Sequence, residues 1–372
     1  MYRDRNTEAF LALLRAGLWE QDVRLSALGD IDYKEVYRLA EEQSVVGVVA
    51  AGLDHVSDVR IPQQKALEFV GGALQLEQTN KAMNDFIAKI VKEMQHLGIY
   101  TLLVKGQGIA QCYERPLWRA CGDVDLFMSD DNYYKAKDYL TGLAQRVDDE
   151  YVMRKHLEMT IDGWSVELHG TLRGDVLTRM DRGIDEVQKK VFYEGNVRSW
   201  ANGNTLVFLP APNEDVILIF THFLQHFFVE GIGLRHVCDW CRLLWRYREE
   251  LDLRLLEKRL KSMRLMSEWK AFSALAIDYL GMPVEAMPFY SDKRKWSKKA
   301  DKVLDFILET GNFGHNRDRS YLSNSSFFVR KAISFCAHIK RMLQRINIFP
   351  WDTMVAWGHT MKVKAGVALK GK

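Results

Sequence analysis

Two aspartates separated by one residue, Asp123 and Asp125, are the clearest candidates for a functional site in this 372-residue sequence. Their segment, Gly-Asp-Val-Asp-Leu (122–126), is predicted to be a β-strand, so both carboxylates point to the same side of it. Two like charges held this close repel each other unless a cation joins them, and Mg²⁺ prefers carboxylate oxygens. The pair therefore indicates a magnesium site, although Asp-x-Asp also occurs at strand ends that face solvent.

Glu167 is the candidate for a third oxygen ligand. Residues 156–161 and 164–169 alternate in polarity and flank Asp162-Gly163, a dipeptide typical of a hairpin turn. The alternation places Glu167 and His169 on the same face of the second strand. Three carboxylates that converge from two strands could hold one or two Mg²⁺ ions against a nucleoside triphosphate, as nucleotidyl transfer requires.

Residues suited to phosphate binding precede the two aspartates. Lys105 and Gly106 follow a predicted strand at 100–104. Lysine supplies a positive charge, and glycine permits close backbone approach at the start of a helix, where free amides face phosphate. Gln107 could add a hydrogen bond through its side-chain amide. Arg119 could neutralise another phosphate oxygen or pair with a surface acid.

Four other polar residues leave more than one role open. His169 could contact phosphate or an acceptor, orient Glu167, or be structural, and His156 on the paired strand is equally ambiguous. Arg235 and Asp239 are one helical turn apart, so they could form an ion pair or face a cleft and contact substrate.

Cys238 and Cys241, with His222, His226 and His236 nearby, have the composition of a metal or redox cluster. They lie, however, in predicted helices rich in large apolar residues. That setting favours a buried pair of reduced thiols, and histidines in the core or at an interface.

The motifs occur in a definite order, which is Leu103-Val-Lys-Gly106, Tyr113, Arg119, Gly122-Asp-Val-Asp-Leu126, His156 and Val166-Glu-Leu-His169. In this order they resemble the bacterial "uncharacterised nucleotidyltransferase" family of the polymerase-β-like superfamily. The resemblance covers roughly residues 95–250, and includes Leu234-Arg-His-Val-Cys-Asp239. Weaker similarity at 309–314 extends it further.

The resemblance implies a small palm-like mixed sheet in which Asp123 and Asp125 bind Mg²⁺ and Glu167 is the third acid. The implied reaction transfers a nucleoside monophosphate, with ATP as the expected donor, to an unknown hydroxyl-bearing acceptor and releases pyrophosphate. The sequence departs from the superfamily pattern at Gln107, because serine usually follows the glycine. An alternative is therefore a catalytically inactive nucleotide-binding or regulatory protein, such as an antitoxin-like partner or a membrane-associated scaffold.

The elements that must position these residues predict an α+β fold. Helices are expected at 7–18, 33–43 and 62–97, strands at 100–104 and 124–128, and a further helix from 130 to about 144. From Pro210-Ala-Pro212 onward the pattern is helical, at 213–230, 234–249, 252–264, 267–280, 294–310 and 327–346. The predicted organisation is an N-terminal helical region (1–98), a nucleotidyltransferase domain (99–210), a C-terminal helical domain (211–346) and a basic aromatic tail (347–372).

The composition fits a folded cytoplasmic protein, with 47% hydrophobic residues, 27% charged residues and a formal net charge of +3. Five cysteines, an odd number, do not indicate a disulfide framework, and residues 1–8 do not lead into the apolar core of a secretory signal. Cytoplasmic localisation is therefore expected.

Positive charge is concentrated at the C-terminal end. Between residues 327 and 372, nine Lys and Arg accompany a single acid, Asp352. Phe349, Trp351 and Trp357, followed by a lysine-rich end, would suit peripheral contact with an anionic membrane surface, although an amphipathic segment of this kind more often packs on its own domain. Nucleic acid is not an expected partner, because no continuous basic-aromatic groove is visible upstream.

Overall fold

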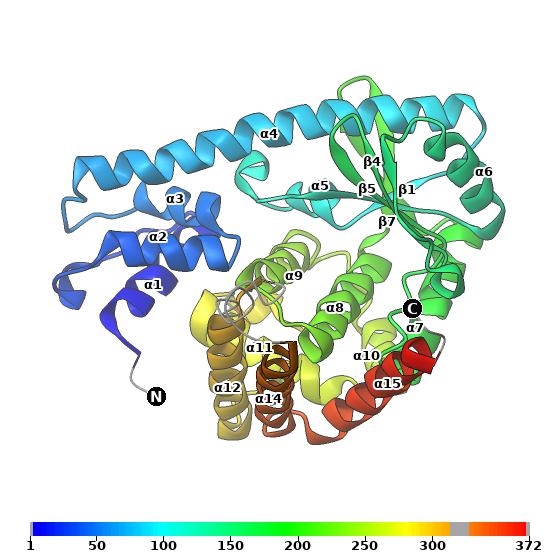
Figure 1. Ribbon diagram of the computed structural model, residues 1–372. Coiled ribbons are helices and arrows are strands. Elements are labelled where there is room, and N and C mark those ends of the chain that lie inside the picture. The colour runs from blue at the N-terminus through cyan, green and yellow to red at the C-terminus, as the bar shows by residue number, and fades with distance from the viewer. Residues whose placement is uncertain (1–2, 313–326, 370–372) are drawn as a thin grey trace.

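A computed structural model of the chain describes residues 3–312 and 327–369, in which helical regions lie on either side of a mixed β-sheet (Figure 1). Before the sheet come α1 (Arg5–Trp19), α2 (Tyr33–Glu42), α3 (Val46–Leu53) and α4 (Gln63–His96). Among the strands lie α5 (Gly106–Ala110), α6 (Asp130–Thr141) and α7 (Thr178–Tyr193). The sheet is followed by α8 (Pro212–Val229), α9 (Leu234–Arg246), α10 (Leu253–Ser262), α11 (Met266–Leu280), α12 (Arg294–Thr310), α14 (Phe327–Ile346) and α15 (Pro350–Leu369).

The sheet of the described residues has seven strands in the order β3-β4-β5-β2-β1-β7-β6. The strands are β1 (Leu102–Val104), β2 (Asp123–Phe127), β3 (Arg146–Val147), β4 (His156–Ile161), β5 (Trp164–His169), β6 (Val197–Asn202) and β7 (Thr205–Pro210). β2 lies at the centre, antiparallel to β1 and parallel to β5. This mixed sheet between helical regions confirms the predicted α+β fold class.

One face of the sheet packs against α4 and α6. Val124 and Leu126 of β2 are buried there together with Leu168 of β5. The α4 residues in the same cluster are Met83, Phe86, Ile87, Ile90, Val91 and Met94. Because side chains alternate along a strand, Asp123 and Asp125 point to the opposite face, where α8 and α9 lie.

An aromatic core holds together the helices that follow the sheet. The ring of Phe220 in α8 is 4.8 Å from that of Trp269 in α11, and Trp269 is 4.7 Å from Trp240 in α9. All three side chains are fully buried. Large aromatic side chains contribute much of the stabilisation of such a core, so α8 and α9 present a fixed surface to the sheet.

The structure differs from the sequence-based expectations at some element boundaries and in several elements that were not predicted. β1 begins at Leu102 rather than at residue 100, and α9 ends at Arg246 rather than at 249. The sequence analysis did not identify α3, α7 or the β6–β7 hairpin. Asn202-Gly203 is a hairpin turn signal, but the residues of β6 show no apolar alternation, and its side chains are half-buried or exposed on both faces.

The segment predicted as a basic tail is largely helical. Ile348 and Phe349 are buried just before α15, and the Phe349 ring stacks 6.4 Å from that of Phe272. The side chains that α15 exposes include Trp351, Met354, Val355, Trp357 and Met361. Across the described residues, no helix combines the length and the apolar character that crossing a bilayer requires.

Three ionisable residues, Arg179, Glu268 and Asp352, lie together where α7, α11 and α15 meet. Glu268 and Asp352 are only 3% and 5% exposed, and Arg179 Nη2 donates a 2.5 Å hydrogen bond to Asp352 Oδ1. Burial, followed by the hydrogen bond to Asp352 and the charge of that carboxylate, raises the pKa of Glu268 to about 9. Glu268 is therefore protonated in the folded protein at neutral pH.

The raised pKa of Glu268, which lies beside Asp352, predicts that the stability of the folded protein depends on pH. Between about pH 4.5 and 9 the folded protein retains a proton that Glu268 of the unfolded chain has lost, so stability should fall as the pH rises. Glu268→Gln keeps a hydrogen-bond donor and removes the titration. It should raise the unfolding temperature by roughly 3–6 °C at pH 8, with little change at pH 5. Thermal unfolding at both pH values, with exposed Glu285→Gln as control, measures this, and equal slopes in wild type and Glu268→Gln would contradict it.

Candidate functional site

Strands β2 and β5 bring three carboxylates together. The strands are parallel, and Asp125 pairs in register with Glu167, while Asp123 pairs with Ser165. One oxygen each from Asp123, Asp125 and Glu167 lie within 4.8 Å of one another. The three acids of the predicted site therefore lie in one place, although they come from strands separated by some forty residues in the sequence.

This acidic group has the donor chemistry of a magnesium site, because three carboxylate oxygens at this spacing suit one or two hard divalent cations. Protein cations also contact it. Lys105 Nζ lies 2.5 Å from Asp125 Oδ1, and His169 Nε2 lies 2.9 Å from the same oxygen. Asp125 is only 2% exposed, so its charge requires such partners.

The pKa shifts of the site reflect its excess of negative charge. The charge of Asp125, together with burial, raises the pKa of Asp123 above its ordinary value. Burial lowers the pKa of Lys105, but the charges of Asp125, Glu167 and Asp123 outweigh burial and raise that pKa. An additional cation would therefore be stabilised here.

An unusual turn places Lys105 beside the acids. Its backbone has φ +58° and ψ −148°, a conformation that costs a non-glycine residue about 1–3 kcal/mol. Gly106 follows with φ +42°. A Cβ atom at Gly106 would lie 3.2 Å from Cys121 Sγ and 3.4 Å from the carbonyl oxygen of Asp123. Glycine is thus required where the turn packs closely against β2.

His156 and His169 lie beside Glu167. They are directly opposite each other across the β4–β5 hairpin, and their rings stack with centroids 4.8 Å apart. Each Nε2 lies 3.3 Å from Glu167 Oε2. Burial raises the pKa of Glu167, but the two histidines and Lys105 together lower it well below its ordinary range. Because His169 also contacts Asp125, it orients two of the three acids, which is one of the roles that the sequence left open.

The same three residues, His156, Glu167 and His169, form a second group whose ligand atoms lie within 4.8 Å of one another. Glu167 belongs to both groups. The edge of the acidic site therefore also offers imidazole nitrogens, which suit softer divalent metals than Mg²⁺.

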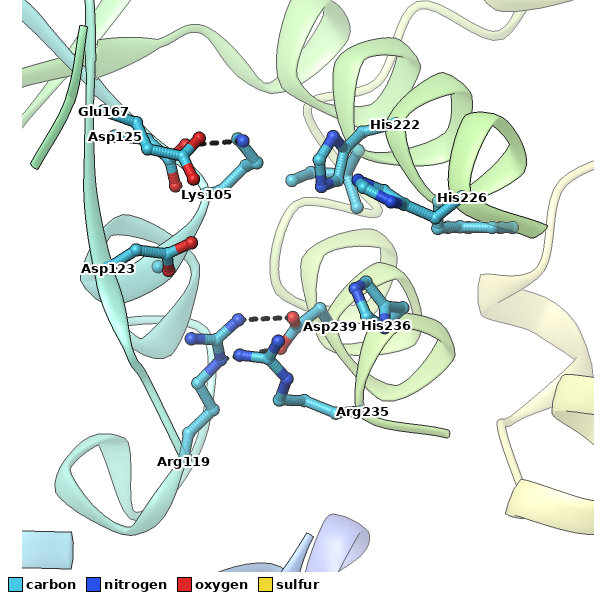
Figure 2. Close-up of a pocket in the computed structure, with 13 residues that line it drawn as sticks. Lys105, Arg119, Asp123, Asp125, Glu167, His222, His226, Arg235, His236 and Asp239 are labelled. Carbon is cyan, nitrogen blue, oxygen red and sulfur yellow. Dashed lines mark hydrogen bonds and ion pairs between the residues drawn. The ribbon is translucent and has the colours of Figure 1, made fainter. Parts of the chain in front are cut away.

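The acids form one wall of a cavity of about 220 Å³ (Figure 2). The opposite wall comes from α8 and α9 and consists of Ile219, His222, Phe223, His226, Arg235, His236 and Asp239. A second cavity of about 420 Å³ shares Lys105, Glu167, His222 and His226 with the first, so the two cavities adjoin there. The second cavity extends to His359 of α15.

Arg119 pairs with a buried acid rather than with a surface acid. Its Nε and Nη2 donate to the two oxygens of Asp239 at 3.0 and 2.6 Å, and the Tyr113 hydroxyl donates to Asp239 at 2.8 Å. Arg235 Nη1 donates instead to the carbonyl oxygen of Ala120 at 2.9 Å. Asp239 is therefore the partner of Arg119 and not of Arg235, and all three side chains line the cavity.

Gln107 does not line this cavity. The side chain is 1% exposed, and its Nε2 donates a 2.6 Å hydrogen bond to Asn80 Oδ1 in α4. Asn80 in turn donates to the carbonyl oxygens of Leu117 and Arg119, at 2.8 and 2.9 Å. The amide that we expected to contact phosphate instead connects α4 to the loop that carries Arg119.

His222 and His226, which the sequence analysis expected in the core or at an interface, line the cavity together with His236. The rings of His222 and His226 in α8 are 4.6 Å apart, and His236 of α9 is 6.3 Å from each. Burial, reinforced by neighbouring positive charges, lowers the pKa of His222 and His236 well below the ordinary value, so both are neutral. The sequence does contain a signal for a polar surface here. His222, Gln225 and His226 lie on one face of α8, within its largely apolar part at 216–229.

Cys238 and Cys241 are free and buried, as the sequence analysis expected. Burial raises the pKa of both thiols, which makes them unreactive at neutral pH. Within the described residues, the groups that could hold a metal do not include them.

The mixed sheet carries three acids on adjacent strands and faces a helical wall across the cavity, which agrees with the fold that the sequence resemblance implied. The chain belongs to the uncharacterised nucleotidyltransferase family, whose model matches residues 29–280, more than half of the chain. The match extends beyond the range of 95–250 on both sides. It ends before the segment 309–314, of which residues 313 and 314 lie outside the described residues. No curated protein and no solved structure matches the chain.

Because Lys105 and a divalent cation would compete for Asp125, removal of the ammonium group gives a test of the acidic site. We expect Lys105→Met to lose about 2–4 kcal/mol of stability without metal, because it leaves a buried carboxylate without its strongest partner. Added Mg²⁺ should restore most of that loss and raise the unfolding temperature more than in wild type. Lys92→Met, at an exposed position of α4, is the control. Identical Mg²⁺ responses in all three proteins would argue against cation binding at Asp125.

Proposed function

We propose that this protein is a magnesium-dependent nucleotidyltransferase, with ATP as the expected donor and a hydroxyl-bearing molecule as acceptor. The observation that supports it most is the cavity in which Asp123, Asp125 and Glu167 face basic side chains across a short distance. These three carboxylates would hold one or two Mg²⁺ ions. When bound, Mg²⁺ would neutralise phosphate charge and polarise the reacting phosphoryl group.

In the proposed reaction the acceptor oxygen attacks the α-phosphorus. A bond forms between that oxygen and the α-phosphorus, and the bond from the α-phosphorus to the oxygen that bridges it to the β-phosphate breaks. The acceptor proton passes to a carboxylate of the site, and pyrophosphate leaves. The products are a nucleotidylated acceptor and pyrophosphate, so atoms and charge balance without a further reactant.

The surrounding residues have separate roles in this proposal. Lys105 and Arg119 bind phosphate, and Gly106 allows the backbone to approach it. His169 orients Asp125 and Glu167 through the contacts described above. The adjoining cavity of about 420 Å³ provides room for the nucleoside or for the acceptor.

Replacing both aspartates tests the assignment. Asp123→Ala together with Asp125→Ala should reduce magnesium-dependent nucleotide turnover by about a thousandfold or more, because no carboxylate pair remains to hold the metal. The measurement is release of pyrophosphate from ATP. The control carries Asp131→Ala and Asp138→Ala, two exposed positions of α6 that remove the same charge. Circular dichroism checks that both double variants are folded. Unchanged turnover in the variant that lacks Asp123 and Asp125 would contradict the assignment.

A second candidate is a nucleotide-binding or regulatory protein without catalysis. It is supported by Gln107, which stands where serine is usual and whose amide is bonded to Asn80. Calorimetry with ATP and Mg²⁺, combined with a pyrophosphate assay over an acceptor panel, separates the two. Heat with pyrophosphate release favours the transferase, whereas heat without release from any acceptor favours the regulatory protein.

We further propose that α15 makes peripheral contact with an anionic bilayer, because its described part exposes Trp351, Met354 and Trp357 at the start of the lysine-rich end. The double variant Trp351→Ser, Met354→Ser should bind vesicles that contain phosphatidylserine at least about fivefold more weakly than wild type in co-sedimentation. Val284→Ser, at another exposed apolar position, should bind like wild type. Equal binding to purely zwitterionic vesicles would contradict the proposal.

A further inference from the structure

We propose that Arg235, together with Arg119, binds the β- and γ-phosphates of the nucleoside triphosphate, so that the leaving pyrophosphate lies against α9. This inference rests on the proposed nucleotidyl transfer and adds a location for the leaving group. It also brings a residue of the helical wall, Arg235, into the phosphate site.

Two guanidinium nitrogens at this end of the cavity have no acceptor among the residues that the structure describes. Arg119 is only 4% exposed and uses Nε and Nη2 on Asp239, which leaves its Nη1 without a hydrogen-bond partner among the described residues. Arg235 uses Nη1 on the carbonyl of Ala120, and its buried Nε is likewise unpaired within the described part of the chain. A buried donor without an acceptor is unfavourable, so a ligand that supplies acceptor oxygens would be favoured here.

The two side chains approach each other from different elements. Figure 2 shows the guanidinium groups of Arg119, from the loop before β2, and Arg235, from α9, close to each other and next to Asp239. Asp239 balances one of the two positive charges. Burial, together with the charge of Arg119, lowers the pKa of Arg235 from its ordinary value, but a guanidinium remains protonated at neutral pH. One positive charge thus lacks a carboxylate ion-pair partner within residues 3–312 and 327–369, and it favours an anion.

The rest of the cavity restricts which anion fits. Its other wall is the acidic group of Asp123, Asp125 and Glu167, which would repel an anion that carries no metal. A ligand that satisfies both walls presents phosphate oxygens to the arginines and a bound cation to the carboxylates. The metal-bound diphosphate part of a nucleoside triphosphate has this character, and planar guanidinium groups suit its oxygens. The nucleoside and the acceptor are then directed to the adjoining, larger cavity.

Calorimetry with inorganic pyrophosphate and Mg²⁺ tests the inference on the full chain. Arg235→Met should bind pyrophosphate at least about tenfold more weakly than wild type does. AMP lacks the β- and γ-phosphates, so both proteins should bind it equally. Arg246→Met changes an exposed arginine of the same helix and should behave like wild type. Arg235→Lys retains the charge without the fork, and an intermediate affinity would confirm that the anion site survives in a folded protein.

Two results would overturn the inference: unchanged pyrophosphate affinity in Arg235→Met, or an equal loss of AMP and pyrophosphate affinity in that variant. Pyrophosphate binds without reacting, so the test does not depend on turnover. If wild type turns over ATP and Arg235→Met still binds pyrophosphate normally, the inference fails and the proposed function stands. If no acceptor supports turnover but Arg235 governs pyrophosphate affinity, the proposed reaction fails and the anion site stands.

Discussion

Three carboxylates packed side by side between β2 and β5 must be neutralised, and much of the surrounding structure meets that requirement. Lys105 contacts Asp125 from a backbone conformation that few L-residues adopt, and His169 of β5 contacts both Asp125 on the adjacent strand and Glu167 on its own strand. Neither contact fully compensates the charge, because the pKa of Asp123 is still raised by its neighbour. The fold therefore holds a site that is prepared for a cation.

The opposite wall of the cavity is fixed by a different interaction. Asp239 in α9 accepts both hydrogen bonds of a bidentate pair from Arg119, which lies just before β2, and a third from Tyr113. Breaking a buried pair of this kind costs about 3–5 kcal/mol, so the pair fixes the position of α9 relative to the sheet. Behind that wall, the aromatic core around Trp240 and Trp269 keeps α9 in place. The distance between the acids and the arginines is thus set by packing on both sides.

The sequence predicted the acidic wall well, because its signals are local. An Asp-x-Asp pair and a polar stripe on a hairpin identify Asp123, Asp125 and Glu167 through strand periodicity alone. The helical wall could not be predicted in the same way. His222 and Arg235 lie on helices whose amphipathic pattern shows only that one side is polar, and their proximity to the acids depends on tertiary packing. The β6–β7 hairpin was missed for another reason: Asn202-Gly203 and the apolar run 206–209 were local signals, but β6 shows no apolar alternation.

Gln107 shows that a residue within a recognised motif can have a contact that the motif does not predict. Its place in the motif indicated a phosphate contact, yet its amide bonds to Asn80, which also holds the carbonyl oxygens of Leu117 and Arg119. A single helix, α4, thereby supports the loop that carries Arg119 and covers the rear of the sheet with its C-terminal half. The predicted boundary at residue 99 separates α4 from the sheet, so a chain that began there would lose the part of the sheet's cover that α4 provides and the hydrogen bonds from Asn80 to the arginine loop.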